Sequence, residues 1–168
     1  KFTDLKVNPI PEKEYIERYV NFFGIDALKG LNIGLYGHSA VGRDIVYKIF
    51  ISLGAEVTKL SYSDKFIPVD TEAIREDDFK LAPKWANEYK FDSIISTDGD
   101  SDRPLISDEK GNWIRGDVLG VIVSKYLEID AVVTPVSSNS SVDLDLFIKV
   151  VRTKIGSPYV IDSLTQLT

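Results

Sequence analysis

The residues whose types and spacing best suit chemistry are three alternating aspartates, Asp98, Asp100 and Asp102. They directly follow an apolar segment, residues 91–96, that predicts a short buried strand. Two unit charges about 4–5 Å apart repel by roughly 1 kcal/mol in water and by more inside a protein. Three converging carboxylates therefore require either a chain that splays outward or a cation between them. Ligands that are all oxygen favour a hard cation, Mg²⁺ before Ca²⁺ when phosphate is also present.

The surrounding sequence favours convergence. Gly99 allows a sharp turn of the backbone, and ligands of open α/β sheets bind beyond the carboxyl ends of the strands. The alternative is a solvated acidic turn in which Asp98 or Asp100 caps the local backbone. A twelve-residue calcium loop would run from Asp98 to Glu109, but Arg103 occupies the position that requires glycine. The spacing therefore predicts a divalent-metal site that is not an EF-hand.

Other chemistries have weaker support. The chain has no cysteine and a single histidine, His38, which excludes disulfides, thiolate sites and multi-histidine metal sites. Residues 37–44 (GHSAVGRD) nearly fit the phosphate-binding pattern G-x-x-x-x-G-K-[ST], but Arg43 and Asp44 replace its lysine and hydroxyl residue. We expect this segment to be a turn that presents a helix N-terminus, which could help hold an anion, and His38 to be a turn residue.

Composition limits the class of protein. Acidic residues (26) outnumber basic ones (20), the net charge is −6, and no basic cluster suggests nucleic-acid binding. No apolar run approaches the roughly 18–20 residues that span a bilayer, and the N-terminal segment lacks the apolar region of a signal peptide. We therefore expect a soluble, cytoplasmic protein with no nucleic-acid or membrane partner. Because the chain contains no methionine, we also expect it to be a segment of a longer polypeptide.

The elements that must position the aspartates follow an alternating order. Strands are predicted at 31–36 and 55–60 with a helix at 41–53 between them, which is the βαβ unit of a parallel sheet. The strand at 91–96 leads into the acidic loop, and a hairpin joins 104–106 to 113–114. The remaining expected elements are helices at 11–23, 71–89 (where Pro83 could break the helix), 117–127, 142–151 and 158–167, and a strand at 131–136.

This order predicts an α/β fold: a three-layer mixed sheet flanked by helices. One complete domain is expected at residues 1–114, and part of a second, similar domain at residues 115–168.

Residues 97–103 (TDGDSDR) resemble the metal-binding loop of the α-D-phosphohexomutases, which include phosphomannomutase, phosphoglucomutase and phosphoglucosamine mutase. The usual family loop is D-G-D-G-D-R, so Ser101 replaces a glycine while the three aspartates and the arginine are kept. Residues 35–54 resemble the opening of the family's second domain, and Gly116-Asp117 with the following helix resembles the start of the third. Residues 152–156 (RTKIG) are similar to the family's T-x-x-G segment near the sugar phosphate.

The resemblance implies an isomerase that moves a phosphoryl group between C6 and C1 of a hexose, through a phosphoserine and a bisphosphate intermediate. It implies a Mg²⁺ cofactor bound by the three aspartates, and a catalytic Arg103 that either contacts phosphoryl oxygens or orients a neighbouring carboxylate. Gly156 and Ser157 would lie near the substrate, although Ser157 replaces the acidic or histidine residue often found there. The implied partners are a hexose phosphate and the remaining domains of the same polypeptide.

The chain also departs from the family pattern. It contains neither the T-A-S-H-N-P-like loop with the catalytic serine nor the sugar-reading G-E-x-S-G-H loop. Residues 137–141 (SSNSS) lack the lysine that family members often carry there, and are alternatively explained as helix caps. We therefore expect this segment alone to be inactive, and the hexose stays open. The competing classes are a non-catalytic divalent-metal-binding interaction module and a phosphatase with an aspartate nucleophile, whose D-x-D usually follows the first strand.

Overall fold

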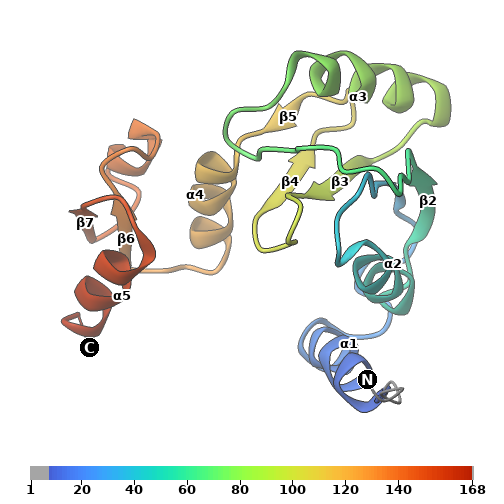
Figure 1. The fold of residues 1–168 in the computed structure, drawn as a ribbon. Coiled ribbons are helices and arrows are strands. Elements are labelled where there is room, and N and C mark those ends of the chain that lie inside the picture. The colour runs from blue at the N-terminus through green and yellow to red at the C-terminus, as the bar shows by residue number, and fades with distance from the viewer. Residues whose placement is uncertain (1–7, 168) are drawn as a thin grey trace, which may run out of the picture. The chain divides into compact units, whose positions relative to one another are not determined.

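The computed structural model describes residues 8–167, which divide into two compact units between Trp113 and Ile114. The first unit is built on a five-stranded sheet with the strand order β2-β1-β3-β4-β5 (Figure 1). No helix within residues 8–167 is long and apolar enough to cross a membrane. The strands of this sheet are β1 (Asn32–Tyr36), β2 (Glu56–Leu60), β3 (Ser93–Thr97), β4 (Pro104–Ser107) and β5 (Trp113–Ile114).

The pairing of these strands decides where the acidic loop lies. Strand β1 pairs in parallel with β2 on one side and with β3 on the other, and β3 pairs antiparallel with β4. Because β1 and β3 are parallel neighbours, their carboxyl ends meet at the same edge of the sheet. The predicted mixed sheet is therefore confirmed, and each strand begins and ends within two residues of its expected bounds.

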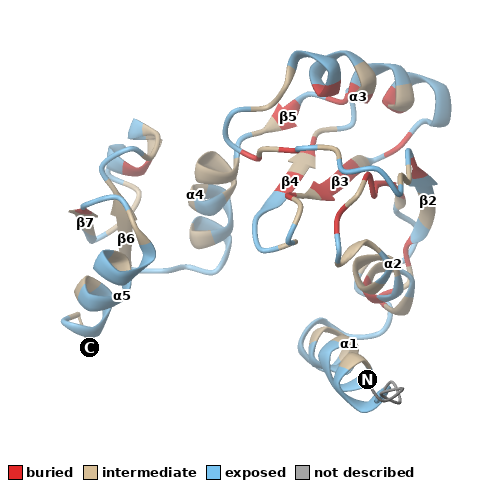
Figure 2. Cartoon of the chain, viewed as in Figure 1, coloured by how far each residue is buried: buried red, intermediate tan, exposed pale blue. Residues whose placement is uncertain are grey.

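Helices cover both faces of the sheet, as a three-layer α/β fold requires (Figure 1). Helix α3 (Glu76–Tyr89) packs on the face that carries Ile94, whereas α2 (Arg43–Ser52) packs on the face that carries Ile95. Successive strand residues point to opposite faces, so the apolar run of β3 is buried on both sides (Figure 2). Helix α1 (Ile10–Phe23) lies outside this core and contacts α2.

Two helices of the first unit differ from the expected ranges. Helix α2 begins at Arg43 rather than at residue 41. Helix α3 begins at Glu76 rather than at residue 71, because Asp70 Oδ1 accepts hydrogen bonds from the backbone N–H groups of residues 72 and 73 and holds a turn there. Pro83, where a break was considered, does not interrupt the helix, since α3 continues through it to Tyr89.

In the second unit, one expected helix is absent. The helix expected at 142–151 is replaced by a 3-10 turn, η1 (Ser140–Asp143), and a strand, β7 (Lys149–Thr153). The β-branched residues Val150 and Val151 pack well in a strand, and they pair in parallel with Val132 and Val133 of β6. The spacing of apolar residues in this segment is compatible with a helix and with a strand, and pairing with β6 favours the strand. The other elements of this unit are α4 (Gly116–Tyr126), β6 (Ala131–Pro135) and α5 (Ser157–Thr165).

Candidate metal centre

The acidic loop, residues 98–103, leaves the carboxyl end of β3 beside the turn 37–42 that leaves the carboxyl end of β1. Two hydrogen bonds join the loop to this turn. The Val41 N–H donates to the Gly99 carbonyl oxygen at 3.0 Å, and the Gly42 N–H donates to Ser101 Oγ at 2.9 Å. The amides at the start of α2 therefore hold the acidic loop.

The three aspartates converge as their spacing predicts. One carboxylate oxygen from each of Asp98, Asp100 and Asp102 lies within 4.8 Å of the others. This separation is close to twice the metal–oxygen distance of a hard cation, about 2.0–2.6 Å. Asp98 is buried, whereas Asp100 and Asp102 are exposed. The donor set is all oxygen and open on one side, so it fits a divalent cation of the Mg²⁺ or Ca²⁺ type.

Arg103 pairs with the buried member of this set. Its Nε atom donates to Asp98 Oδ2 at 2.7 Å, while Asp98 Oδ1 accepts the backbone N–H groups of Asp102 and Arg103. Burial opposes ionisation of Asp98, but the hydrogen bonds from Arg103 outweigh it and lower the pKa of this carboxyl group. The same side-chain hydrogen bond raises the pKa of Arg103. The geometry thus matches the second of the two roles considered for Arg103, in which it orients a neighbouring carboxylate.

Repulsion within the loop is visible in its outer carboxylates. A side-chain hydrogen bond with Asp98 is the main cause that raises the pKa of Asp102, and the negative charge of Asp100 adds to this effect. Asp100 itself forms no hydrogen bond or ion pair with any residue among 8–167. Asp102 has an ion-pair partner in Arg103, whose Nε lies 3.6 Å from Asp102 Oδ1, whereas Asp100 has none among the described residues. A cation between the carboxylates would relieve their repulsion.

A hollow of about 460 Å³ lies beside the loop and contains residues that the sequence analysis missed. Arg75 contributes to its wall, as does Asp70, whose pKa is lowered by the N–H groups of residues 73 and 72. Residues 61–70 lie between two expected elements, and no functional role was predicted for them. The position of this segment in the chain could have indicated its role, because it follows β2, whose carboxyl end lies at the same edge of the sheet as that of β1. The other lining residues are Phe66, Pro68, Val69, Asp98, Gly99, Asp100 and Arg103.

The near match to a phosphate-binding loop has a structural explanation. Arg43 Nη1 donates to the backbone oxygens of His38 at 2.5 Å and of Ser63 at 2.6 Å. The guanidinium also lies over the ring of Tyr62, with 4.8 Å to its centroid. Arg43 therefore stabilises the turn after β1, and its guanidinium is bound to backbone oxygens and to the Tyr62 ring rather than free to bind a phosphate.

His38 is fully buried in this turn, with a backbone φ of 31°. Its Nε2 atom lies 2.9 Å from the Thr97 carbonyl oxygen, which can only accept, so Nε2 carries the proton. The other ring nitrogen, Nδ1, is buried without a hydrogen-bond partner. Burial lowers the pKa of His38 and outweighs the opposing effects of the Thr97 hydrogen bond and the Asp78 charge.

A pH dependence of stability follows from this burial. We expect the free energy of unfolding to decrease as pH falls below 6.5, because the unfolded histidine then takes up a proton that the folded one resists. Above that pH both states are neutral and the effect vanishes. The measurement is the melting temperature at about pH 7.5 and about pH 5.5, a window in which histidine titrates. His38→Gln should reduce the dependence, and an identical slope in the variant would contradict this assignment.

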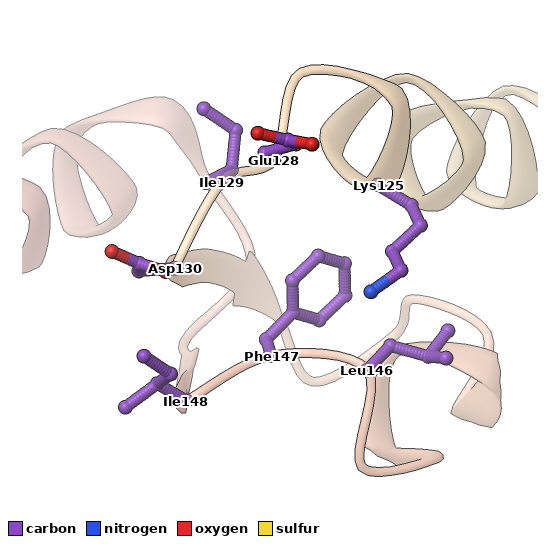
Figure 3. Close-up of a pocket in the computed structure, with 7 residues that line it drawn as sticks. All are labelled: Lys125, Glu128, Ile129, Asp130, Leu146, Phe147 and Ile148. Atoms are coloured by element: carbon purple, nitrogen blue, oxygen red, sulfur yellow. The ribbon is translucent and has the colours of Figure 1, made fainter.

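The other residues expected to act lie in the second unit. Gly156, with φ 131°, precedes α5, and Ser157 is the first residue of that helix. Their expected contact with substrate stays a prediction. The capping explanation for 137–141 is confirmed, because Asn139 Oδ1 accepts the Ser141 N–H at 2.8 Å. Figure 3 shows a further hollow of this unit, of about 390 Å³, which Lys125 and Phe147 help to line.

Known proteins share both the sequence and the fold. The phosphomannomutase of Salmonella muenchen is 50% identical over 169 residues, which cover 100% of this chain and 35% of that protein. The phosphomannomutase of Sinorhizobium fredii is 48% identical, covering 90% of this chain and 32% of that protein. A phosphoglucosamine mutase of Clostridium acetobutylicum is 33% identical, covering 92% of this chain and 36% of that protein. The chain thus spans about a third of the length of the curated relatives it matches.

A solved structure agrees with these relatives at the level of the fold. A phosphoglucomutase/phosphomannomutase family protein from Burkholderia thailandensis superposes with a TM-score of 0.76 at 15% identity, over 92% of this chain and 35% of that one. Residues 13–111 match the family described as phosphoglucomutase/phosphomannomutase, alpha/beta/alpha domain II. These residues contain the whole acidic loop and the strands that position it. The chain therefore belongs to the phosphoglucomutase/phosphomannomutase family.

Proposed function

We propose that this chain supplies the metal-binding part of a phosphohexomutase, an isomerase that interconverts hexose 6-phosphate and hexose 1-phosphate. The observation that supports it is the convergence of Asp98, Asp100 and Asp102 at the carboxyl edge of the sheet, in a chain that belongs to this family. Relatives named phosphomannomutase share about half of its residues, which favours mannose phosphate as the first substrate to test. A relative named phosphoglucosamine mutase makes glucosamine phosphate the second.

Each residue of the loop has a proposed role in this chemistry. The three aspartates would hold Mg²⁺, which neutralises the oxygens of the transferring phosphoryl group. Arg103 keeps Asp98 ionised and oriented, and neither of its Nη atoms has a hydrogen-bond partner among residues 8–167, so both can donate to a phosphoryl oxygen. The phosphoserine that donates the phosphoryl group, and the bisphosphate intermediate that follows, are part of the proposal. Gly156 and Ser157 complete it as residues near the sugar phosphate.

The domain assignment is proposed with the function. Residues 1–114 would form the family's second domain and residues 115–168 part of its third. The catalytic serine and the sugar-reading loop would then come from other parts of the polypeptide, because no T-A-S-H-N-P or G-E-x-S-G-H string is present. We therefore expect residues 1–168 alone to show no mutase activity and to bind Mg²⁺ weakly.

The test uses the full-length protein in coupled assays with mannose 1-phosphate, glucose 1-phosphate and glucosamine 1-phosphate, with a catalytic amount of the sugar bisphosphate. We expect turnover of at least one sugar with Mg²⁺, and loss of turnover when EDTA removes the metal. Turnover that persists in EDTA would contradict the proposed metal. No turnover of any sugar, with Mg²⁺ binding retained, would instead favour a non-catalytic metal-binding interaction module.

A further inference from the structure

Ser101 occupies an unusual backbone position in the middle of the acidic loop. Its φ is 67°, in the left-handed region that residues with a Cβ adopt only at a cost in free energy. The usual phosphohexomutase loop has glycine here, which adopts this conformation freely. This chain therefore keeps the turn of the loop while carrying a side chain that makes the turn less favourable, and that side chain must be stabilised by its surroundings.

The stabilising contacts of Ser101 come from outside the loop. Ser101 Oγ accepts the Gly42 backbone N–H at 2.9 Å and the Thr97 hydroxyl at 3.3 Å. The contact with Gly42 is tight, because a Cβ built on Gly42 would lie 2.9 Å from both Cβ and Oγ of Ser101. The Ser101 hydroxyl thus joins the midpoint of the acidic loop to the first residue before α2.

The position of this contact matters for the metal ligands. Asp100 and Asp102, the two exposed carboxylates, flank Ser101 directly, and like charges this close repel each other when no cation lies between them. The hydrogen bond of Ser101 to Gly42 anchors the backbone between Asp100 and Asp102 and limits how far the two carboxylates can separate. Ligands that are already held together lose less conformational freedom on binding, and this raises affinity.

We propose that Ser101 is a positioning residue: its hydroxyl, through the Gly42 N–H, holds the metal-binding aspartates close together before the cation arrives. This inference rests on the metal centre of the proposed function. Ser101 does not contact the reacting atoms and is not a catalytic residue. It is specific to this chain's variant of the loop, since a glycine at the same place has no side chain with which to form the contact.

The first test measures Mn²⁺ binding to the full-length protein by electron paramagnetic resonance, without sugar phosphate. Ser101→Ala should raise the Kd for Mn²⁺ about 5–10-fold, which is the effect of losing one hydrogen bond. Ser101→Gly should raise it less, because glycine removes the backbone strain along with the hydroxyl. The matched control is Ser61→Ala: Ser61 also has a positive φ, of 46°, and its hydroxyl has no hydrogen-bond partner among residues 8–167, so the Kd should not change.

Two outcomes of this test separate the inference from the function on which it rests. Wild-type affinity in Ser101→Ala would overturn the positioning role while leaving the metal centre intact. Absence of Mn²⁺ binding in the wild type would contradict the metal centre, and the positioning of its ligands with it. In mutase assays, the Mg²⁺ concentration for half-maximal activity should rise in Ser101→Ala more than kcat at saturating Mg²⁺ falls. General damage to the fold would instead lower kcat with little change in that Mg²⁺ concentration.

The second test needs no metal. Gly42 has φ −89°, which alanine can adopt, and the atoms that a Cβ would meet there within 4 Å belong to Ser101. Gly42→Ala should therefore lower the melting temperature in the wild-type background and lower it much less in the Ser101→Gly background. Equal losses in the two backgrounds would overturn the contact between Gly42 and Ser101.

Discussion

In the full-length protein, Asp100→Asn is expected to lower kcat/KM of the proposed mutase reaction by about 10²–10³-fold without lowering the melting temperature. Charge stabilisation by a bound cation contributes several kcal/mol to phosphoryl transfer, and each 1.36 kcal/mol corresponds to about a tenfold change in rate. Asp100 is the informative ligand to change, because it is exposed and forms no hydrogen bond or ion pair within residues 8–167. Its loss should therefore remove a metal ligand without removing a structural contact.

Coupled assays at several Mg²⁺ concentrations, together with thermal melts, check this expectation. The matched control is Asp26→Asn, which makes the same change of charge at an exposed residue whose partner is Lys29 at 3.6 Å. The control should retain wild-type activity. If Asp100→Asn turns over sugar phosphate as fast as the wild type, the acidic loop does not carry the metal. Asp98→Asn would be a poorer test, since Asp98 also organises the loop backbone and Arg103.

Asp78→Ala is expected to lower the free energy of unfolding by about 3 kcal/mol, the largest stability effect among these predictions. Asp78 is 1% exposed on α3 and accepts two hydrogen bonds from Arg75, at 2.8 and 2.9 Å. It also accepts the Tyr36 hydroxyl at 3.1 Å. Burial, then the charge of Asp78, raises the pKa of Tyr36 to about 12, so this hydroxyl remains a donor. Removing the carboxylate leaves a partly buried guanidinium and a buried hydroxyl without their acceptor.

Urea unfolding of the variants measures this loss. The matched control on the same helix is Glu76→Ala, because Glu76 forms an ion pair with Lys80 but its side chain is 82% exposed. Exposed pairs of this kind contribute at most about 0.5 kcal/mol, so the control should be nearly as stable as the wild type. Equal effects of the two substitutions would mean that the contacts of Asp78 with Arg75 and Tyr36 do not stabilise the core.

The two aspartates differ in how readily the sequence reveals them. Asp100 belongs to an alternating series after a strand, a pattern whose chemistry can be read directly from residue types. Asp78 lies in a helical segment rich in charged residues, where an exposed side chain is the ordinary expectation. Its burial depends on Tyr36 and Arg75, and Tyr36 is distant in sequence.

The sequence by itself determined the order of strands and helices in the first unit, the α/β class and the candidate ligands Asp98, Asp100 and Asp102. These features follow from local periodicity, turn residues and the spacing of like charges, all of which act within a few residues. Only the tertiary structure decided the strand at 149–153, since pairing with β6 outweighs a helical apolar spacing there. It also decided the contact of Ser101 with Gly42, because the parallel pairing of β1 and β3 brings together two turns that are 59 residues apart.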